Sequence, residues 1–267
     1  MQLEQGGLRI YRDEEFTLKS IKAITFDLWD TVINDDSDEP IRKEMGLRTK
    51  RDERHFLVWQ AVNKVSPLPL ETVKSAYEDI NAEFNQVWHD EFITWTVSQR
   101  LNRVLLKLNV EISDKSFDDT VEALESLEVD LPPRPIEGVH GALAEISREF
   151  PLAVVSDTIN TPGTGLRAWL EKHDLKQYFR VFAFSDEVGR SKPHRDIFAC
   201  ALDGLGARFE DAVHIGDREH NDIRGAHALG MRAILFTATR DADAENTTAD
   251  AVCKSYAQLP AILNQLN

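Results

Sequence analysis

Residues 21–31 read IKAITFDLWDT, a short apolar run that ends at a carboxylate and is followed by a polar turn. This pattern predicts a buried strand whose carboxyl end carries Asp27. In an open parallel sheet, ligands bind outside the carboxyl ends of the strands, so a carboxylate there can act as a nucleophile or a metal ligand. An aspartate that only forms a turn is the alternative, and other stretches decide between the two.

Three later stretches place chemically useful side chains in comparable positions. The run LAVVSDT reaches the hydroxyl of Ser156, a hydrogen-bond donor, which is followed directly by Asp157. The segment GRSKP sets Lys192 in a turn just before a helical pattern. The segment VHIGDREHND carries Asp217 and Asp222 behind a glycine. A candidate nucleophile, a hydroxyl, a lysine and an acidic pair therefore follow one another in that order.

Each of these side chains also has an ordinary structural explanation. Lys192 alone would be a surface lysine in a turn, and Asp217 and Asp222 would suit a capped, solvated helix start. The place of Lys192 between a glycine and a proline, and the Gly216 that precedes Asp217, favour the functional interpretation. Turn formation also explains Asp157, although its place at the crevice makes it a candidate substrate contact.

Taken together, these residues resemble the four motifs of the haloacid dehalogenase (HAD) superfamily of hydrolases. The matching positions are Asp27 to Thr31, Ser156, Lys192 with its proline, and Gly216 and Asp217 through Asp222. The resemblance implies an α/β fold with a doubly wound parallel sheet (HAD-like, Rossmannoid) and an inserted α-helical cap domain. In such hydrolases the cap closes over the site, excludes water and brings specificity residues to the substrate.

The hydrophobic pattern supports this organisation. From about residue 41 to 132 the apolar residues recur with a helical period, and the prolines of the LPPRP segment stop the last helix. Strands and helices then alternate, which predicts a parallel sheet covered on both faces. We expect residues 1–33 and 134–267 to form the α/β core and residues 34–133 the helical cap. Residues 1 to about 20 are a polar lead-in that could add an edge hairpin.

Composition limits the partners and the compartment. The chain has 267 residues and a formal net charge of −15, which argues against nucleic acid or anionic membranes as principal partners. No apolar stretch approaches the roughly 20 residues that span a bilayer, and the N-terminus lacks a signal pattern, so a cytoplasmic location is expected. Cys200 and Cys253 are expected to be free thiols, and the oligomeric state is left open.

Several other polar and aromatic residues have simpler expectations. The acidic stretch NDDSDEP at residues 34–40 lacks the regular ligands and the glycine of a calcium loop, so we expect a solvated hinge. His214 falls within a strand pattern and is expected in the core, and His220 is expected to be exposed. The aromatic side chains with helical spacing are expected to fill the cap core rather than line a pocket, namely Trp59, Trp88 and Trp95.

The resemblance, read with the chemistry of phosphoryl transfer, gives the acidic residues their expected roles. Transfer to a carboxylate needs an attacking oxygen, a divalent ion and donors for the equatorial oxygens. Asp27 would attack the phosphorus. Mg²⁺, which prefers hard oxygen ligands, would be held by Asp27, Asp217 and the backbone carbonyl of Trp29. Asp222 would be a further ligand or would orient the others.

The remaining candidates would bind the phosphate or support the nucleophile. Ser156 and nearby backbone amides would donate hydrogen bonds to a phosphate oxygen, and Asp157 lies beside them. Lys192 would neutralise the transferred group and steady Asp27. Thr31 would brace the turn after the nucleophile.

Trp29 departs from the pattern of the HAD phosphatases. These enzymes normally have a second aspartate two residues after the nucleophile, where it protonates the leaving oxygen and later activates water. An indole cannot transfer a proton at neutral pH, and Asp30, one residue later, is an open substitute. The L-2-haloacid dehalogenases of the superfamily have an aromatic residue, tyrosine, at this position, because halide leaves without a proton. Trp29 therefore raises that alternative.

The other motifs favour a phosphatase. Dehalogenases need no metal, and their fourth motif typically has serine and asparagine where this chain has Gly216 and Asp217. Their cap arginine has candidates by position in Arg48, Arg51 and Arg54, although such arginines are usually solvated. We expect a Mg²⁺-dependent phosphatase acting on a small organic phosphate through an aspartyl phosphate. A 2-haloacid dehalogenase and a non-catalytic HAD-like metal-binding protein are the alternatives.

Overall fold

The computed structural model describes residues 20–267, so the predicted edge hairpin in the first residues lies outside the described part of the chain. Its main feature is a six-stranded parallel sheet in the order β5-β4-β1-β6-β7-β8. The strands are β1 (Ala23–Phe26), β4 (Leu152–Ser156), β5 (Phe179–Phe184), β6 (Ala212–Gly216), β7 (Arg232–Phe236) and β8 (Ala251–Cys253). The predicted fold class, a doubly wound parallel α/β sheet, is confirmed.

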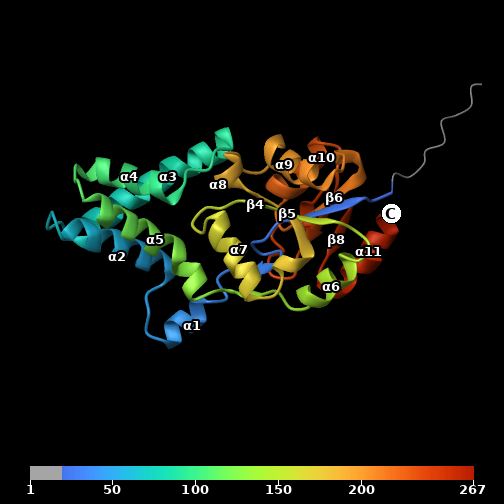
Figure 1. Cartoon of the computed structure of the whole chain (residues 1–267), viewed down its shortest axis with the longest axis horizontal. Helices are drawn as coiled ribbons and strands as arrows, with labels where there is room; N and C mark the ends of the chain where they lie inside the picture. The colour runs from blue at the N-terminus through green and yellow to red at the C-terminus, as the bar shows by residue number, and fades with distance from the viewer. Residues whose placement is uncertain (1–19) are drawn as a thin grey trace, which may run out of the picture.

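Helices cover both faces of this sheet, as Figure 1 shows. One face packs against α6 (Val139–Ile146), α7 (Gly163–Lys172) and α11 (Leu259–Leu266). The other packs against α9 (Arg195–Leu205) and α10 (Gly225–Ala228). Alternate strand residues face the two layers, because successive side chains of a strand point to opposite faces. In β4, for example, Val154 belongs to the first layer and Val155 to the second.

Short helices complete this part of the chain. They comprise α8 (Ser185–Val188), a π-helix η3 (Glu219–Arg224), and the 3₁₀ turns η1 (Lys176–Tyr178), η2 (Phe209–Asp211), η4 (Ala244–Asn246) and η5 (Tyr256–Gln258). Ser185 directly follows β5 and begins α8. Within residues 20–267, no helix is both long and apolar enough to cross a membrane.

A group of helices is inserted between β1 and β4. It contains α1 (Glu39–Glu44), α2 (Lys50–Asn63), α3 (Leu70–Glu91), α4 (Val97–Leu108) and α5 (Asp114–Asp130). A two-stranded antiparallel ribbon, β2 (Ile33–Asn34) with β3 (Arg134–Pro135), joins the start and end of the insert. The pattern did not predict this ribbon, because two-residue strands carry no readable period.

The apolar side chains of α2 to α5 form a cluster of their own, built from residues such as Val58, Ile80 and Leu101. Each helix presents one apolar stripe, so four helices packed together can bury their stripes without the sheet. Figure 1 shows α2, α3, α4 and α5 side by side, away from the sheet, with the C-terminal end of α3 close to α8. At that contact Thr94 donates a hydrogen bond to the Ser185 hydroxyl at 2.8 Å.

Candidate active site

The carboxyl ends of three neighbouring strands gather the predicted residues. Strand β1 pairs in parallel with both β4 and β6, with Phe26 opposite Val154 and Ile215. Asp27 follows β1, Ser156 ends β4, and Asp217 follows β6, so these residues leave the same edge of the sheet. β1 lies where the chain switches from one side of the sheet to the other, which is where ligands bind in open α/β folds.

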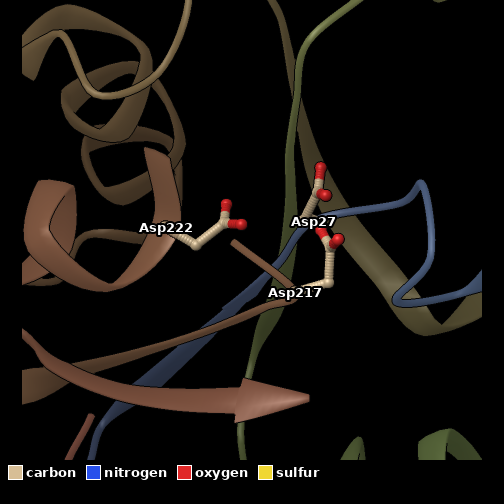
Figure 2. Close-up of side chains that lie close together, drawn as sticks. All are labelled: Asp27, Asp217 and Asp222. Atoms are coloured by element: carbon tan, nitrogen blue, oxygen red, sulfur yellow. The ribbon is translucent and has the colours of Figure 1, made fainter. Parts of the chain in front are cut away.

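Asp27, Asp217 and Asp222 come together at this edge. One carboxylate oxygen from each lies within 4.8 Å of the others, and all three side chains are buried. Figure 2 shows the carboxylates of Asp27 and Asp217 next to each other, with that of Asp222 turned toward them from the neighbouring helical segment. The sequence places these carboxylates up to 195 positions apart, and the strand order unites them.

The carboxylate of Asp217 has the properties of a cation ligand. Both its oxygens are buried and have no hydrogen-bond partner among residues 20–267. Burial, with the charges of Asp222 and Asp27 nearby, raises the pKa of Asp217 to about 8. Burial also raises the pKa of Asp27, because the attraction of Lys192 does not fully offset desolvation. A buried set of hard oxygen donors short of positive charge fits Mg²⁺, which is bound through one or two carboxylates with waters.

Lys192 lies between two of the carboxylates. Its Nζ is 2.7 Å from Asp27 Oδ1 and 2.7 Å from Asp222 Oδ1, and the side chain is only 3% exposed. Burial opposes the charge of Lys192, but the attraction of Asp222 and Asp27 outweighs it and raises the pKa. The same pairing, helped by His214, lowers the pKa of Asp222 despite burial. Lys192 and Asp222 are therefore an ionised pair that holds Asp27.

Three hydrogen-bond donors fix the carboxylate of Asp222. It accepts hydrogen bonds from Lys192, from His214 Nε2 at 3.1 Å and from the Arg218 backbone at 2.9 Å. His214 also contacts the Thr25 hydroxyl through Nδ1 at 2.8 Å. His214 is fully buried, as expected for a core histidine. Because three of its roughly four acceptor positions already receive hydrogen bonds, Asp222 is better suited to orienting Lys192 than to binding a metal directly.

Gly216 is explained by this packing. A Cβ added at Gly216 would lie 2.2 Å from Asp222 Cγ, a distance that real Cβ atoms do not show. The absent side chain lets Asp222, on the π-helix η3, fold back over the end of β6. Such π-helical turns are often found at functional sites.

The two hydroxyl candidates, Ser156 and Thr31, are both buried. Ser156 Oγ and Thr31 Oγ1 have no hydrogen-bond partner among residues 20–267, and both residues are fully buried. The Thr31 carbonyl accepts a hydrogen bond from Tyr256 at 2.5 Å, so its backbone is fixed to the core. The carboxylate of Asp157 accepts from the Lys192 backbone at 2.9 Å, which fixes the loop that carries the lysine.

A cavity of about 300 Å³ reaches part of this site. Asp27, Asp157, Lys192 and Trp29 lie on its wall, whereas Ser156, Thr31 and Asp217 do not line it. Asp30 does not line this cavity, and its carbonyl instead accepts a hydrogen bond from Thr239 at 3.0 Å. Asp30 adopts a left-handed backbone with φ of 53°.

The insert also contributes to the cavity wall. Trp88 on α3 lies there, so the expectation that it fills the helical core was wrong. Sequence reasoning also missed Asp35, Glu128 and Asn221, which share the wall. Spacing could not reveal them, because they come from a linker, a helix of the insert and η3.

The arginines proposed for halide or carboxylate binding are engaged elsewhere. Arg48 pairs with Glu53 at 3.2 Å, and Arg51 pairs with Glu78 at 2.8 Å. Arg54 pairs with Glu128 at 3.3 Å. None of the three lines the cavity.

The acidic stretch is not the solvated hinge that its composition suggests. Asp38 is fully buried, and Lys50, itself 4% exposed, reaches Asp35, Asp36 and Asp38 at 3.0–3.3 Å. A buried ammonium attracts carboxylates that would otherwise remain in water. Cys200 and Cys253 are free thiols in the described structure, as expected.

A family model described as "Haloacid dehalogenase-like hydrolase" matches residues 69–236, more than half of the chain. The chain therefore belongs to the haloacid dehalogenase-like hydrolases and is a hydrolase, as the motifs predicted. It is 23% identical to a glyceraldehyde 3-phosphate phosphatase of Pyrococcus furiosus, over 94% of this chain and 96% of the relative. It is also 23% identical to a 5-amino-6-(5-phospho-D-ribitylamino)uracil phosphatase of Escherichia coli, over 85% of this chain and 86% of that protein.

Solved structures agree on the fold and differ in chemistry. A HAD phosphatase from Thermococcus onnurineus has a TM-score of 0.62 at 20% identity, covering 91% of this chain and 98% of the other. A 2-haloacid dehalogenase from Pseudomonas syringae has a TM-score of 0.60 at 22% identity, covering 92% and 100%. The fold is thus common to both alternatives, and the site must decide between them.

Proposed function

We propose that the protein is a Mg²⁺-dependent phosphatase that acts on a small organic phosphate through an aspartyl phosphate at Asp27. The observation that carries this proposal is the buried carboxylate of Asp217, whose two oxygens have no hydrogen-bond partner in the described structure, next to Asp27 and the Lys192–Asp222 pair. A divalent cation would supply the close positive charge that this carboxylate lacks. The names of the two phosphatase relatives support the same class.

Asp27 and Asp217, with the Trp29 backbone carbonyl, would hold the metal, while Asp222 positions Lys192. When bound, Mg²⁺ would offset the negative charge of the phosphate as it approaches the nucleophile. Asp27 Oδ would attack phosphorus, the P–O bond to the leaving group would break, and the electron pair would depart with that oxygen. Because Trp29 stands where the phosphatases of the family have their acid, the leaving oxygen would take its proton from water. Water would then attack phosphorus and release phosphate and the free Asp27 carboxylate.

Two groups would stabilise the transferred phosphoryl group. The unpartnered hydroxyl of Ser156 supplies a donor for an equatorial oxygen, and the Lys192 ammonium supplies a positive charge 2.7 Å from the nucleophile. Asp157, whose carboxylate holds the Lys192 backbone, would keep that charge in place. Thr31, tied to Tyr256 through its carbonyl, would hold the turn after Asp27.

We assign residues 34–133 as a cap over a core made of residues 1–33 and 134–267, with residues 1–19 of that core outside the described structure. The separate apolar cluster of α2 to α5 and the position of Trp88 on the cavity wall support this division. Arg100 on α4 also reaches across, donating to the carbonyl of Ile159 and to Asn160 Oδ1. Closure of the cap would exclude water from the aspartyl phosphate.

A 2-haloacid dehalogenase is the second candidate, favoured by one observation. Trp29 lines the cavity where the phosphatases of this family have their acid, and an aromatic residue suits halide departure. Arg48 and Arg51 pair with acids away from the cavity, and Arg54 is already paired with the wall residue Glu128, which weakens that candidate.

Phosphate and chloride release distinguish the candidates. The purified protein would be incubated with p-nitrophenyl phosphate, acetyl phosphate or L-2-chloropropionate, with Mg²⁺ or with EDTA, beside the Asp27→Asn variant. Mg²⁺-dependent phosphate release that Asp27→Asn abolishes is expected. Metal-independent chloride release would show a dehalogenase instead, and Mg²⁺ binding without turnover of any of these compounds would show a non-catalytic metal-binding protein.

A further inference from the structure

The cavity wall has two parts that differ in charge. Asp27, Asp157 and Lys192 come from the segments around the sheet, whereas the linker and the insert contribute Asp35 and Glu128. We call this second part the outer wall. The other cation on the cavity wall, Arg218, lies 3.8 Å from Asp217 on the sheet side. The charged lining residues of the outer wall are therefore both acidic.

These carboxylates are fixed in place by a buried lysine. Lys50 Nζ is 3.3 Å from Asp35 Oδ1 and 3.1 Å from Glu128 Oε1, and it also contacts Asp36 and Asp38. Glu128 further accepts from the Thr161 hydroxyl and pairs with Arg54 at 3.3 Å. Two cations therefore face four carboxylates, which leaves the group with net negative charge.

Glu128 remains ionised in this setting. Burial raises its pKa, but Arg54 and Lys50 outweigh burial and lower it below the usual range. Asp35 is less constrained, since 39% of its side chain is exposed to solvent. Asp35 is thus the wall carboxylate that a bound molecule can meet most directly.

The same wall offers a flat apolar surface and one hydrogen-bond donor. Trp29 and Trp88 both line the cavity. Trp88 Nε1 is buried and has no hydrogen-bond partner among residues 20–267. An unpartnered indole N–H beside a cavity suits an acceptor on a bound molecule, such as a hydroxyl oxygen.

We propose that this acidic outer wall selects phosphate esters whose leaving group carries hydroxyl or amino groups, and rejects those with a second phosphate or a carboxylate. The inference rests on the proposed phosphatase activity and adds its substrate class. Like charges placed together in a partly desolvated cavity repel, whereas an ammonium or a hydroxyl can donate to Asp35. Trp29 and Trp88 would cover the carbon skeleton.

Three esters that share a two-carbon spacing test the inference: ethanolamine phosphate, 2-hydroxyethyl phosphate and 2-phosphoglycolate. They differ only in a distal ammonium, hydroxyl or carboxylate. We expect kcat/KM for the first two to exceed that for phosphoglycolate by about ten-fold or more, as one uncompensated like charge would produce. Asp35→Asn should reduce this ratio, chiefly by lowering KM for phosphoglycolate. Glu122→Gln, at an exposed position of α5, should leave the ratio unchanged.

The outcomes distinguish the proposed substrate preference from the phosphatase activity on which it rests. Equal or preferred hydrolysis of phosphoglycolate by the wild type, or a ratio that Asp35→Asn does not change, would overturn the inference and leave the phosphatase intact. Absence of phosphate release from all three esters and from acetyl phosphate would instead overturn the phosphatase, and the inference with it. Glu128→Gln, checked for folding by circular dichroism, provides a second variant at the wall and should narrow the ratio as well.

Discussion

Replacing Asp222 by asparagine tests the central ion pair of the site. The substitution keeps the size of the side chain but removes the charge that faces Lys192 Nζ at 2.7 Å. It also places an amide NH₂ group where one carboxylate oxygen now accepts from Lys192 and His214 and the other from the Arg218 backbone. At least one buried donor would then meet another donor.

The expected cost follows from these contacts. Breaking a buried ion pair by removing one partner typically costs about 3–5 kcal/mol. In the variant, Lys192 keeps its contact with Asp27 at 2.7 Å, and the repulsion between Asp222 and Asp217 disappears. We therefore expect the free energy of unfolding to fall by about 3 kcal/mol, the lower end of this range.

Urea unfolding in EDTA measures this cost through the midpoint at constant m value. Asp79→Asn is the matched control, because Asp79 pairs with Lys107 at 3.0 Å while 54% of its side chain is exposed, and its effect should be small. A loss below about 1 kcal/mol for Asp222→Asn, no larger than for a surface pair, would refute the idea that Asp222 holds Lys192.

Three further changes probe the nucleophile and its surroundings. Trp29→Asp should raise the rate of hydrolysis of alkyl phosphates, by up to the ~10² to 10⁴-fold that a general acid contributes. It should not raise the rate for acetyl phosphate, an acyl phosphate whose leaving group needs no proton, and an equal effect on both substrates would contradict the assigned position. Burial raises the pKa of Asp157 to about 7 from 3.8, so the metal-free protein should lose stability as pH rises from about 4 to 7, by up to about 4 kcal/mol. Asp157→Asn should reduce that slope in urea unfolding at several pH values, although Asp217 and Asp27, whose pKa values burial also raises, keep contributing to it. An unchanged slope would contradict the contribution of Asp157. Gly216→Ala should lower both stability and Mg²⁺-dependent activity, because the new Cβ meets Asp222 at 2.2 Å, and wild-type values in calorimetry and turnover would contradict the packing.

The elements nearest the chemistry were the most predictable from sequence. A β-branched run that stops at a polar side chain identifies both a strand and its carboxyl end, so Asp27, Ser156 and Asp217 could be expected at one edge before the strand order was known. Because β1 lies between β4 and β6 in the sheet, these three residues come close together at that edge. Lys192 was predicted to steady Asp27. Its second contact, with Asp222 at the same distance, could not be predicted, because it depends on how η3 folds back over the end of β6.

The outer part of the site could not be predicted, because no local pattern encodes it. Lys50 and Glu128 are 78 positions apart and meet through the packing of α2 against α5. The acidic stretch was interpreted from its composition alone, which cannot show that a buried lysine lies beside it. Trp88 has helical spacing like its neighbours, and only the position of α3 over the sheet edge places it on the cavity.

The most direct measurement is the capture of the aspartyl phosphate. The protein would be mixed with acetyl phosphate and Mg²⁺, quenched rapidly with acid, digested and examined by mass spectrometry. The account predicts one phosphoryl group on the peptide that contains Asp27, absent when EDTA replaces Mg²⁺ and absent in Asp27→Asn. Phosphate release by Asp27→Asn at the wild-type rate, with no phosphorylated Asp27 peptide from the wild type, would contradict it.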